Sequence, residues 1–271
     1  VHSWCCMNKI IRNFAMPLAV IAASGSVGAA SIIGYSPGAY GSFYTVDLAS
    51  GTRTLLGSGT GLSFQGFEYA PDGTLVGYSP GAYGAFWSVD LASGTRTLMG
   101  CGTGLSFQDF EYAPDGTLVG YSTGAYGSFW SVDLASGTRT LLGSGSGLSF
   151  QGFEYAPDGT LVGYSPGAYG SFWSVDLASG TRTLMGSGTG LSFQDFEYAP
   201  DGTLVGYSTG AYGSFWSVDL ASGTRTLMGS GSGLSFQDFE YAPMGIPEPA
   251  TISLILATLV GLRITRRRTS N

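Results

Sequence analysis

The middle of this chain is a single sequence unit that is repeated five times with a period of 43 residues. Each copy contains short apolar segments separated by Gly-rich turns, and no part of it has helical periodicity. Tandem repeats of about 40 to 50 residues that hold several short strands are typical of β-propellers, in which each copy contributes one four-stranded blade. The repeat therefore predicts an all-β fold. One glycine marks the same position in every copy, as Gly34, Gly77, Gly120, Gly163 and Gly206.

One copy, residues 105–142, contains four strand candidates. The first spans residues 105–113 and ends at Pro114-Asp115-Gly116, which favours a tight turn because Pro fixes φ and Gly tolerates a positive φ. A Ser-Gly hairpin joins the third candidate to the fourth. The second, third and fourth candidates span residues 117–122, 129–134 and 138–142.

The third strand candidate has the alternation of a β-strand. Period two places Trp130, Val132 and Leu134 on one face, and Ser131 and Asp133 on the other. We expect Trp130 to lie in the core between blades and Asp133 to accept hydrogen bonds from the hairpin backbone that follows it. The Asp of each Pro-Asp-Gly sequence is expected to stabilise its turn in the same way.

The order of the strands at the two ends of the array predicts a closed ring. The array begins with residues 31–36, which match the second strand of a repeat. It ends with residues 234–242, which match the first strand of a repeat. If the last strand completes the blade that the first three begin, the array gives 20 strands, or five blades of four. A closed ring leaves no blade with an unmatched edge, whereas an open solenoid needs polar caps that the sequence lacks. We therefore predict a five-bladed β-propeller over residues 31–243, closed by pairing of its N- and C-terminal strands.

The N-terminal segment has the pattern of a secretory signal peptide. A basic region from Met7 to Arg12 is followed by an apolar stretch, residues 14–23, and by small residues at 27–30. We expect residues 1–30 to be a signal peptide that forms one helix, with residues 1–6 upstream of the true start. Such a segment predicts export of the repeat domain.

The C-terminal segment has three parts in a fixed order. A Pro-Glu-Pro motif precedes an apolar run of 13 residues, 250–262, and an arginine cluster. As a helix the run covers roughly 20 Å, which is short for a bilayer core of about 30 Å, so it is a marginal transmembrane helix. The arginines would hold its end on the cytoplasmic side. The motif and the cluster consist of Pro247, Glu248, Pro249, Arg266, Arg267 and Arg268.

This tail closely resembles the PEP-CTERM sorting signal of Gram-negative bacteria, over residues 246–268. The resemblance implies recognition by an exosortase-type processing enzyme in the membrane, cleavage near the motif, and delivery to the cell surface or the extracellular polysaccharide matrix. The chain would be anchored in the inner membrane only before processing. An ordinary C-terminal membrane anchor is the alternative. The turns of the repeat also resemble those of secreted bacterial propellers, which bears on the fold and not on the function.

Charge and composition exclude several functions. Residues 31–243 contain five arginines and 17 acidic residues, a net charge of −12, which repels nucleic acid. They contain no histidine and no lysine, which excludes Ser-His-Asp triads, Cys-His dyads and His-ligated metals. Cys101 stands where the other copies have serine, so no disulfide framework is expected. We predict no catalytic residue, no cofactor and no metal site.

Every copy places a glutamate in its first strand, and three copies add an aspartate two positions before it. Three interpretations remain open: a carboxylate pair for glycoside hydrolysis, a ring of glutamates that binds calcium or sodium, and a structural role in which each glutamate pairs with the arginine of its copy. We favour the structural role. The glutamates are Glu68, Glu111, Glu154, Glu197 and Glu240; the aspartates are Asp109, Asp195 and Asp238; the arginines are Arg53, Arg96, Arg139, Arg182 and Arg225.

Each copy also carries a tyrosine between glycine-rich neighbours in the loop before its third strand. An aromatic ring exposed on such a loop stacks on sugar rings, and five copies would add avidity. These tyrosines are the candidate ligand-binding residues: Tyr40, Tyr83, Tyr126, Tyr169 and Tyr212.

The sequence as a whole predicts a secreted, surface-sorted protein without enzymatic activity, which binds or scaffolds the extracellular polysaccharide matrix. A multivalent carbohydrate-binding lectin and a degenerate glycoside hydrolase are the alternatives. The expected partners are the exosortase-type enzyme, polysaccharide and, through the C-terminal helix before processing, the membrane.

Overall fold

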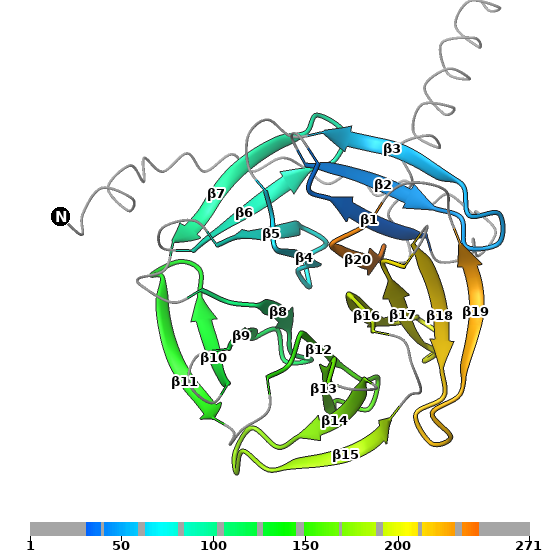
Figure 1. Ribbon diagram of the computed structural model, residues 1–271. Helices are drawn as coiled ribbons and strands as arrows, with labels where there is room; N and C mark the ends of the chain where they lie inside the picture. Colours follow the sequence, from blue (N-terminus) through cyan, green and yellow to red (C-terminus); the bar gives the residue numbers. More distant parts are fainter. Residues whose placement is uncertain are drawn as a thin grey trace, which may run out of the picture.

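The structure, a computed structural model, shows five blades arranged around a central axis (Figure 1). It describes residues 31–243 except 39–40, 59–62, 81–83, 102–105, 124–126, 145–148, 168–169, 188–191, 211–212 and 231–234. The predicted signal peptide and sorting tail lie outside the described residues. Each blade is an antiparallel sheet of four strands, so the prediction of a five-bladed all-β propeller is confirmed.

One blade is built from both ends of the array, and its strands from the axis outward are β20 (Asp238–Tyr241), β1 (Ile32–Ser36), β2 (Ser42–Val46) and β3 (Arg53–Ser58). The second contains β4 (Gly66–Tyr69), β5 (Leu75–Ser79), β6 (Ala85–Asp90) and β7 (Thr95–Cys101). The third contains β8 (Asp109–Tyr112), β9 (Leu118–Ser122), β10 (Ser128–Asp133) and β11 (Thr138–Ser144). The fourth contains β12 (Gly152–Tyr155), β13 (Leu161–Ser165), β14 (Ser171–Val175) and β15 (Arg182–Ser187). The fifth contains β16 (Asp195–Tyr198), β17 (Leu204–Ser208), β18 (Ser214–Val218) and β19 (Arg225–Ser230).

The ring is closed by the two ends of the repeat array, as predicted. Strand β20 pairs antiparallel with β1, from Ile32 opposite Tyr241 to Tyr35 opposite Asp238. The amide of Ala242 extends the pairing by donating to the carbonyl oxygen of Ser31, at 2.9 Å. Figure 1 shows the orange β20 beside the blue β1. The junction therefore has the same hydrogen-bonded architecture as the other four blades.

The first strand of each copy is shorter than predicted. In the third blade it begins at Asp109 and not at residue 105. The reason is that Phe107 turns toward the neighbouring blade, where its amide donates to the hydroxyl of Tyr78 at 3.0 Å and not to a strand of its own sheet. The fourth strand is longer than predicted and reaches Ser144. The remaining boundaries in this blade differ from the predictions by one residue.

Both faces of each blade are buried against the neighbouring blades. Trp130, Val132 and Leu134 pack into one apolar cluster, whereas Phe129 packs into the cluster on the opposite side of the sheet. The predicted alternation along β10 is therefore confirmed, and so is the place of Trp130 between blades. Five such clusters, one at each junction, form the core.

The glycine that marks each copy is required by this packing. In β9 the ring of Phe107 lies flat over Gly120, and a Cβ atom at Gly120 would lie 2.8 Å from that ring. The guanidinium of Arg139 stacks on the same phenylalanine, 4.5 Å from its centroid. The repeated Leu-Val-Gly-Tyr sequence thus leaves room for an aromatic ring that wedges between two blades.

The predicted turns are present. Gly116 has a φ of +83°, which only glycine adopts without strain, and the side chain of Asp115 accepts a hydrogen bond from the amide of Thr117 at 2.9 Å. In the following hairpin Asp133 accepts from the amide of Ala135 at 2.8 Å and from the hydroxyl of Ser136 at 2.6 Å. These aspartates therefore stabilise turns, as the sequence indicated.

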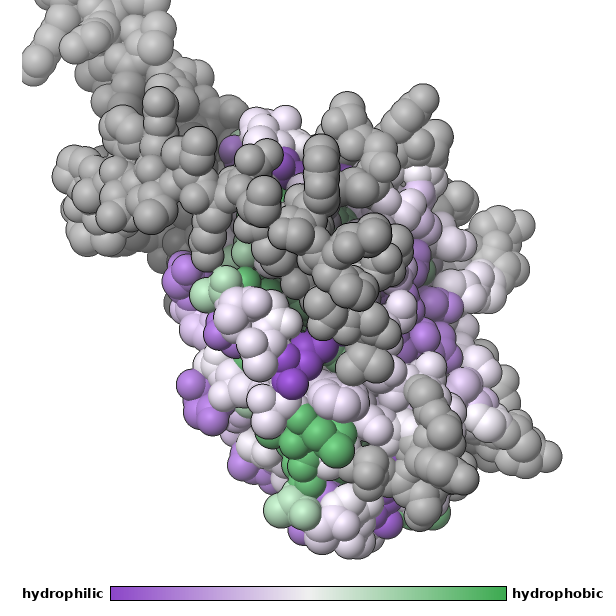
Figure 2. All heavy atoms as spheres, turned by 90° about the vertical axis from the view of Figure 1, so that its left-hand side faces the viewer, coloured by the Kyte–Doolittle hydropathy of each residue, from purple (hydrophilic) through white to green (hydrophobic). Residues whose placement is uncertain are grey.

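The rim of the ring is largely hydrophilic, with a small apolar patch visible in Figure 2. The outermost strands expose one leucine per copy, between 40% and 55% of its surface: Leu55, Leu98, Leu141, Leu184 and Leu227. Among the residues that the structure describes, no helix is long and apolar enough to cross a membrane.

Candidate functional site: an acidic axial channel

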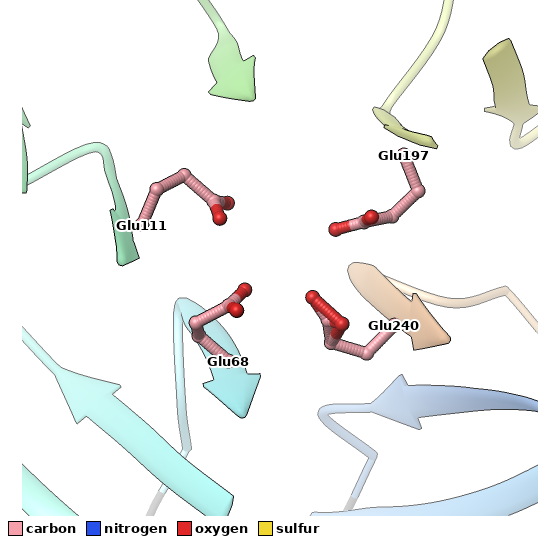
Figure 3. A group of neighbouring side chains, drawn as sticks. All are labelled: Glu68, Glu111, Glu197 and Glu240. Atoms are coloured by element: carbon pink, nitrogen blue, oxygen red, sulfur yellow. The ribbon is translucent and has the colours of Figure 1, made fainter. Parts of the chain in front are cut away.

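The innermost strands of the five blades converge on the axis and bring their glutamates together. Figure 3 shows four carboxylate groups that point toward one another, each from a different blade. One oxygen atom of each lies within 4.8 Å of the corresponding oxygen of all the others. Three of the side chains are at most 8% exposed, and Oε2 of Glu68 is completely buried. The four residues are Glu68, Glu111, Glu197 and Glu240, and we call them the glutamate cluster.

The alternation of the innermost strand explains why carboxylates meet at the axis. In β8, Asp109 and Glu111 share one side of the strand, while Phe110 between them is 1% exposed in the apolar cluster at the blade junction. Residues two apart along a strand are separated by roughly 6.6 Å. The channel therefore has a layer of glutamates and, about that distance along the axis, a second polar layer.

The second layer surrounds a cavity of about 30 Å³. A cavity of this size holds about one water molecule or a small ion, and it excludes a sugar ring. One glutamine amide is fixed by a neighbour, since Nε2 of Gln151 donates to the carbonyl oxygen of Gln194 at 3.1 Å. The lining consists of Gln65, Gln108, Gln151, Gln194, Gln237, Asp109, Asp195 and Asp238, and we call it the glutamine vestibule.

The two glycines that replace aspartate in this layer follow a rule. Where the fourth blade has Gly152, Asp109 of the third blade fills the space, and its Oδ2 accepts a hydrogen bond from the amide of Phe153 at 2.8 Å. A Cβ atom at Gly152 would lie 3.1 Å from that carboxylate oxygen. The same relation holds where Asp238 accepts from the amide of Phe67, at 2.5 Å, beside Gly66. Aspartate and glycine therefore alternate around the ring.

Alternation cannot be completed around five blades, so one adjacent pair must be alike. That pair is Asp195 and Asp238, on the adjacent innermost strands β16 and β20. Asp195 also accepts a hydrogen bond from the amide of Phe239 at 2.9 Å. The two carboxyl groups interact directly, and this interaction partly offsets the rise that burial causes in the pKa of Asp195. Burial, and then the charge of Asp195, raise the pKa of Asp238 well above its usual value.

The glutamates are protonated more readily than free carboxyl groups. Burial is the main reason that the pKa values of Glu111, Glu197 and Glu240 lie well above the usual value, and the charges of neighbouring glutamates raise them further. The pKa of Glu154, the fifth copy, is raised in the same way by burial and by Glu68. The channel is therefore a place where either protons or bound cations must compensate negative charge.

This arrangement predicts how stability depends on pH. The raised pKa values mean that the folded chain holds these protons to a higher pH than the unfolded chain does, so their stabilising contribution is present at low pH and is lost as the pH rises. The turn aspartates have lowered pKa values, so their contribution is lost as the pH falls below about 4. In the presence of EDTA we expect the melting temperature to be highest near pH 5 and to fall toward pH 8. Thermal unfolding followed by circular dichroism tests this, and a melting temperature that rises steadily to pH 8 contradicts it.

The structure places the other predicted residues as follows. The arginines lie on the outermost strands, where each stacks 4.4 to 4.5 Å from a phenylalanine centroid, and not at the axis beside the glutamates. The glutamate–arginine pairing that we favoured is therefore wrong: the arginines stack on phenylalanine rings in the outer strands, and the glutamates meet one another at the axis. The candidate ligand-binding tyrosines and the sorting-motif residues lie outside the described part of the chain.

Sequence reasoning missed the glutamine vestibule. Its signal was present, since every copy has glutamine directly before the aspartate or glycine position of its first strand. The alternation of aspartate with glycine was also visible but had no meaning without the order of the blades around the ring.

Comparison with known proteins supports the fold only. No protein-family model matches the sequence, and no curated protein resembles it. TolB from Acinetobacter baumannii is similar in structure, with 18% identity and a TM-score of 0.51 over 74% of this chain and 53% of TolB, so the chain spans about half of that protein. A chain of the nidogen/laminin complex has 12% identity and a TM-score of 0.55 over 81% of this chain and 100% of its own length. A gluconolactonase from Xanthomonas campestris has 16% identity and a TM-score of 0.51 over 78% of this chain and 79% of its own.

Proposed function

We propose that the protein is an exported, non-enzymatic scaffold or binding protein of the extracellular polysaccharide matrix. The observation that carries the non-enzymatic part is the size of the channel. Its vestibule has a volume of about 30 Å³, which is too small for an organic substrate, and three of the glutamates beyond it are at most 8% exposed. The channel walls are formed by five nearly identical copies, whereas catalysis requires one asymmetric arrangement of acid, base and substrate.

The proposed location rests on the two ends of the sequence. The signal peptide pattern at residues 1–30 and the tail at residues 246–268 support export, transient anchoring in the inner membrane and release by an exosortase-type enzyme. The net charge of −12 over residues 31–243 disfavours binding to nucleic acid and to anionic lipid. A rigid ring of this kind would present its loops repeatedly to polysaccharide, and a lectin that uses the five loop tyrosines is the second candidate.

Expression of the full chain in a Gram-negative host with and without an exosortase tests the proposed location. We expect the wild-type protein to reach the cell surface or matrix only in the host with the enzyme. A variant with Pro247→Ala, Glu248→Ala and Pro249→Ala should remain in the inner membrane in both hosts. Equal release of both proteins would contradict sorting through this motif, and fractionation with immunoblotting provides the measurement.

The released protein then tests the non-enzymatic assignment. Because a gluconolactonase shares the fold, the assay includes gluconolactone hydrolysis together with a panel of polysaccharides. We expect no turnover above buffer. Hydrolysis that is lost on Glu197→Gln would overturn the assignment in favour of an enzyme. Glycan binding that is lost when Tyr126 and its four equivalents are changed to alanine would select the lectin.

A further inference from the structure

We propose that the glutamate cluster binds one Ca²⁺ ion on the axis of the ring. The proposal goes beyond the function given above and does not depend on it, because it concerns residues inside the described ring. Figure 3 shows the cluster: four side chains from four blades whose carboxylates surround a common point.

The spacing of the oxygen atoms fits calcium. Ca²⁺ lies about 2.3 to 2.6 Å from its oxygen ligands, so oxygens on opposite sides of the ion are about 4.6 to 5.2 Å apart. The four carboxylate oxygens of the cluster lie within 4.8 Å of one another, a separation compatible with such a shell. Mg²⁺ requires oxygens about 2.0 to 2.1 Å away in near-ideal octahedral geometry, which four converging long side chains do not offer. The cluster contains no nitrogen or sulfur ligand that would select zinc or another transition metal.

One carboxylate oxygen in the cluster lacks a partner outside it. Oε2 of Glu68 is fully buried and has no hydrogen-bond partner outside the cluster, and its side chain points toward the carboxyl groups of Glu111 and Glu240, with which it interacts. A buried oxygen that is not satisfied costs about 1 to 3 kcal/mol, and more when it is charged. Such an atom is rare in a well-packed protein, and a bound cation on the axis would satisfy it.

The part of the ring that the structure describes supplies no cation of its own at the axis. Residues 31–243 contain five basic side chains, all of them arginines on the outermost strands, where they stack on phenylalanine rings. The buried carboxyl groups of the channel therefore depend on protons or on an ion from solvent for compensation. A bound ion would also stabilise the ring in a way that protons do not, because it attracts carboxylates from four blades toward one point.

The glutamine vestibule provides a polar entrance to the cluster. Its cavity of about 30 Å³ is lined by amide and carboxylate groups and lies roughly 6.6 Å along the axis from the glutamates. Amide and carboxylate oxygens are the groups that replace the water shell of a hard cation. The acidic channel thus has two parts: the glutamate cluster, whose oxygen spacing fits Ca²⁺, and the glutamine vestibule, through which a partly hydrated ion reaches it.

Calcium and protons compete for these carboxylates, so binding must strengthen as the pH rises. The titratable groups that face the site come from all five innermost strands. They are Glu68 of β4, Asp109 and Glu111 of β8, Glu154 of β12, Asp195 and Glu197 of β16, and Asp238 and Glu240 of β20. The tyrosine after each glutamate lies on the opposite side of its strand in an apolar cluster, and burial and nearby carboxylates raise its pKa; these residues are Tyr69, Tyr112, Tyr155, Tyr198 and Tyr241.

The test uses the purified full chain after treatment with EDTA and buffer exchange. Titration with CaCl₂ at pH 8 is expected to give one bound ion per chain by isothermal titration calorimetry and to raise the melting temperature by about 5 °C or more. MgCl₂ at the same concentration should give a much smaller rise. At pH 5 the affinity for calcium should fall at least tenfold. Failure to bind calcium at pH 8, or binding of equal strength at pH 5, would overturn the proposal.

Matched variants separate the axis from the acidic surface. Glu197→Gln removes one ligand and should weaken calcium binding at least tenfold, whereas Asp158→Asn removes one carboxylate from an exposed turn and should leave it unchanged. Equal loss in both variants, or in neither, would show that calcium binds elsewhere. If Glu197→Gln does not fold, Glu240→Gln replaces it, and the pH dependence of the wild-type protein tests the site without any substitution.

Discussion

A chain that ends after Ser230 is expected to lose cooperative unfolding. The deletion removes β20 and with it the partner of β1, so the first blade is left with three strands and an open inner edge. It also removes Phe236 and Phe239, which are 1% and 0% exposed in the apolar cluster at the closure. Loss of a buried phenylalanine costs about 3 to 5 kcal/mol, so the two together approach the whole stability of a typical domain, roughly 5 to 15 kcal/mol.

The measurement is unfolding in urea followed by tryptophan fluorescence and circular dichroism. The truncated chain should give a broad transition, or none, and should aggregate through the exposed edge. A second truncation after Ile246 retains β20 and serves as the control, which should unfold with the sharp transition of the full ring. A sharp transition at the same midpoint in both truncations would show that the closing strand contributes little.

A circular permutant separates the loss of the strand from the position of the chain ends. In the third blade Ala113 pairs with Thr117 across the Pro-Asp-Gly turn in the way that Ala242 pairs with Ser31 at the closure. Insertion of Asp-Gly between Pro243 and Ser31 would therefore rebuild the same turn, and the permutant would be opened within the turn of the third blade. Because this blade then takes over the closing role, we expect a midpoint close to that of the parent ring.

The fold was predictable because its determinants are local and repeated. The period of the repeat, the alternation around Trp130 and the Pro-Asp-Gly turns each fix one feature of a blade. The five copies then specify the ring, since the strand types at the two ends leave one blade to be completed by both. Errors were confined to strand ends such as the start of β8, where the amide of Phe107 donates to Tyr78 of the preceding blade and not to its own sheet.

The channel was not predictable to the same degree, because it depends on which blades are neighbours. Asp109 hydrogen-bonds a backbone amide 44 residues away, in the next copy, and no pattern within one copy contains that information. Asp195 and Asp238 belong to consecutive copies, and their direct interaction depends on how neighbouring blades pack, which no single copy shows. The same holds for the glutamate cluster, where the sequence allowed either a pairing with arginine or a meeting at the axis.

Replacement of Gly57 by alanine is expected to destabilise the ring strongly. Gly57 lies in β3 beside a register shift in the pairing with β2, at Phe43 and Tyr44, and its backbone approaches the neighbouring blade closely. A Cβ atom at residue 57 would lie 2.5 Å from the carbonyl oxygen of Leu91. Because this oxygen is a backbone atom, it cannot move aside as the end of a flexible side chain does. Forcing an extra methyl group into such a contact costs roughly 3 kcal/mol. For a ring of this size we expect the melting temperature to fall by about 6 to 12 °C.

The matched control is Gly38→Ala, because a Cβ atom at Gly38 meets no atom within 4 Å and its φ is compatible with alanine. This substitution restricts the unfolded chain and should leave stability unchanged or raise it by about 0.4 to 1 kcal/mol. Differential scanning calorimetry of the two variants beside the wild-type protein measures the difference. Equal melting temperatures in Gly57→Ala and Gly38→Ala would mean that adjacent blades shift apart to make room for the methyl group without a loss of stability. The close approach of each outermost strand to the next blade would then not be what holds the ring together.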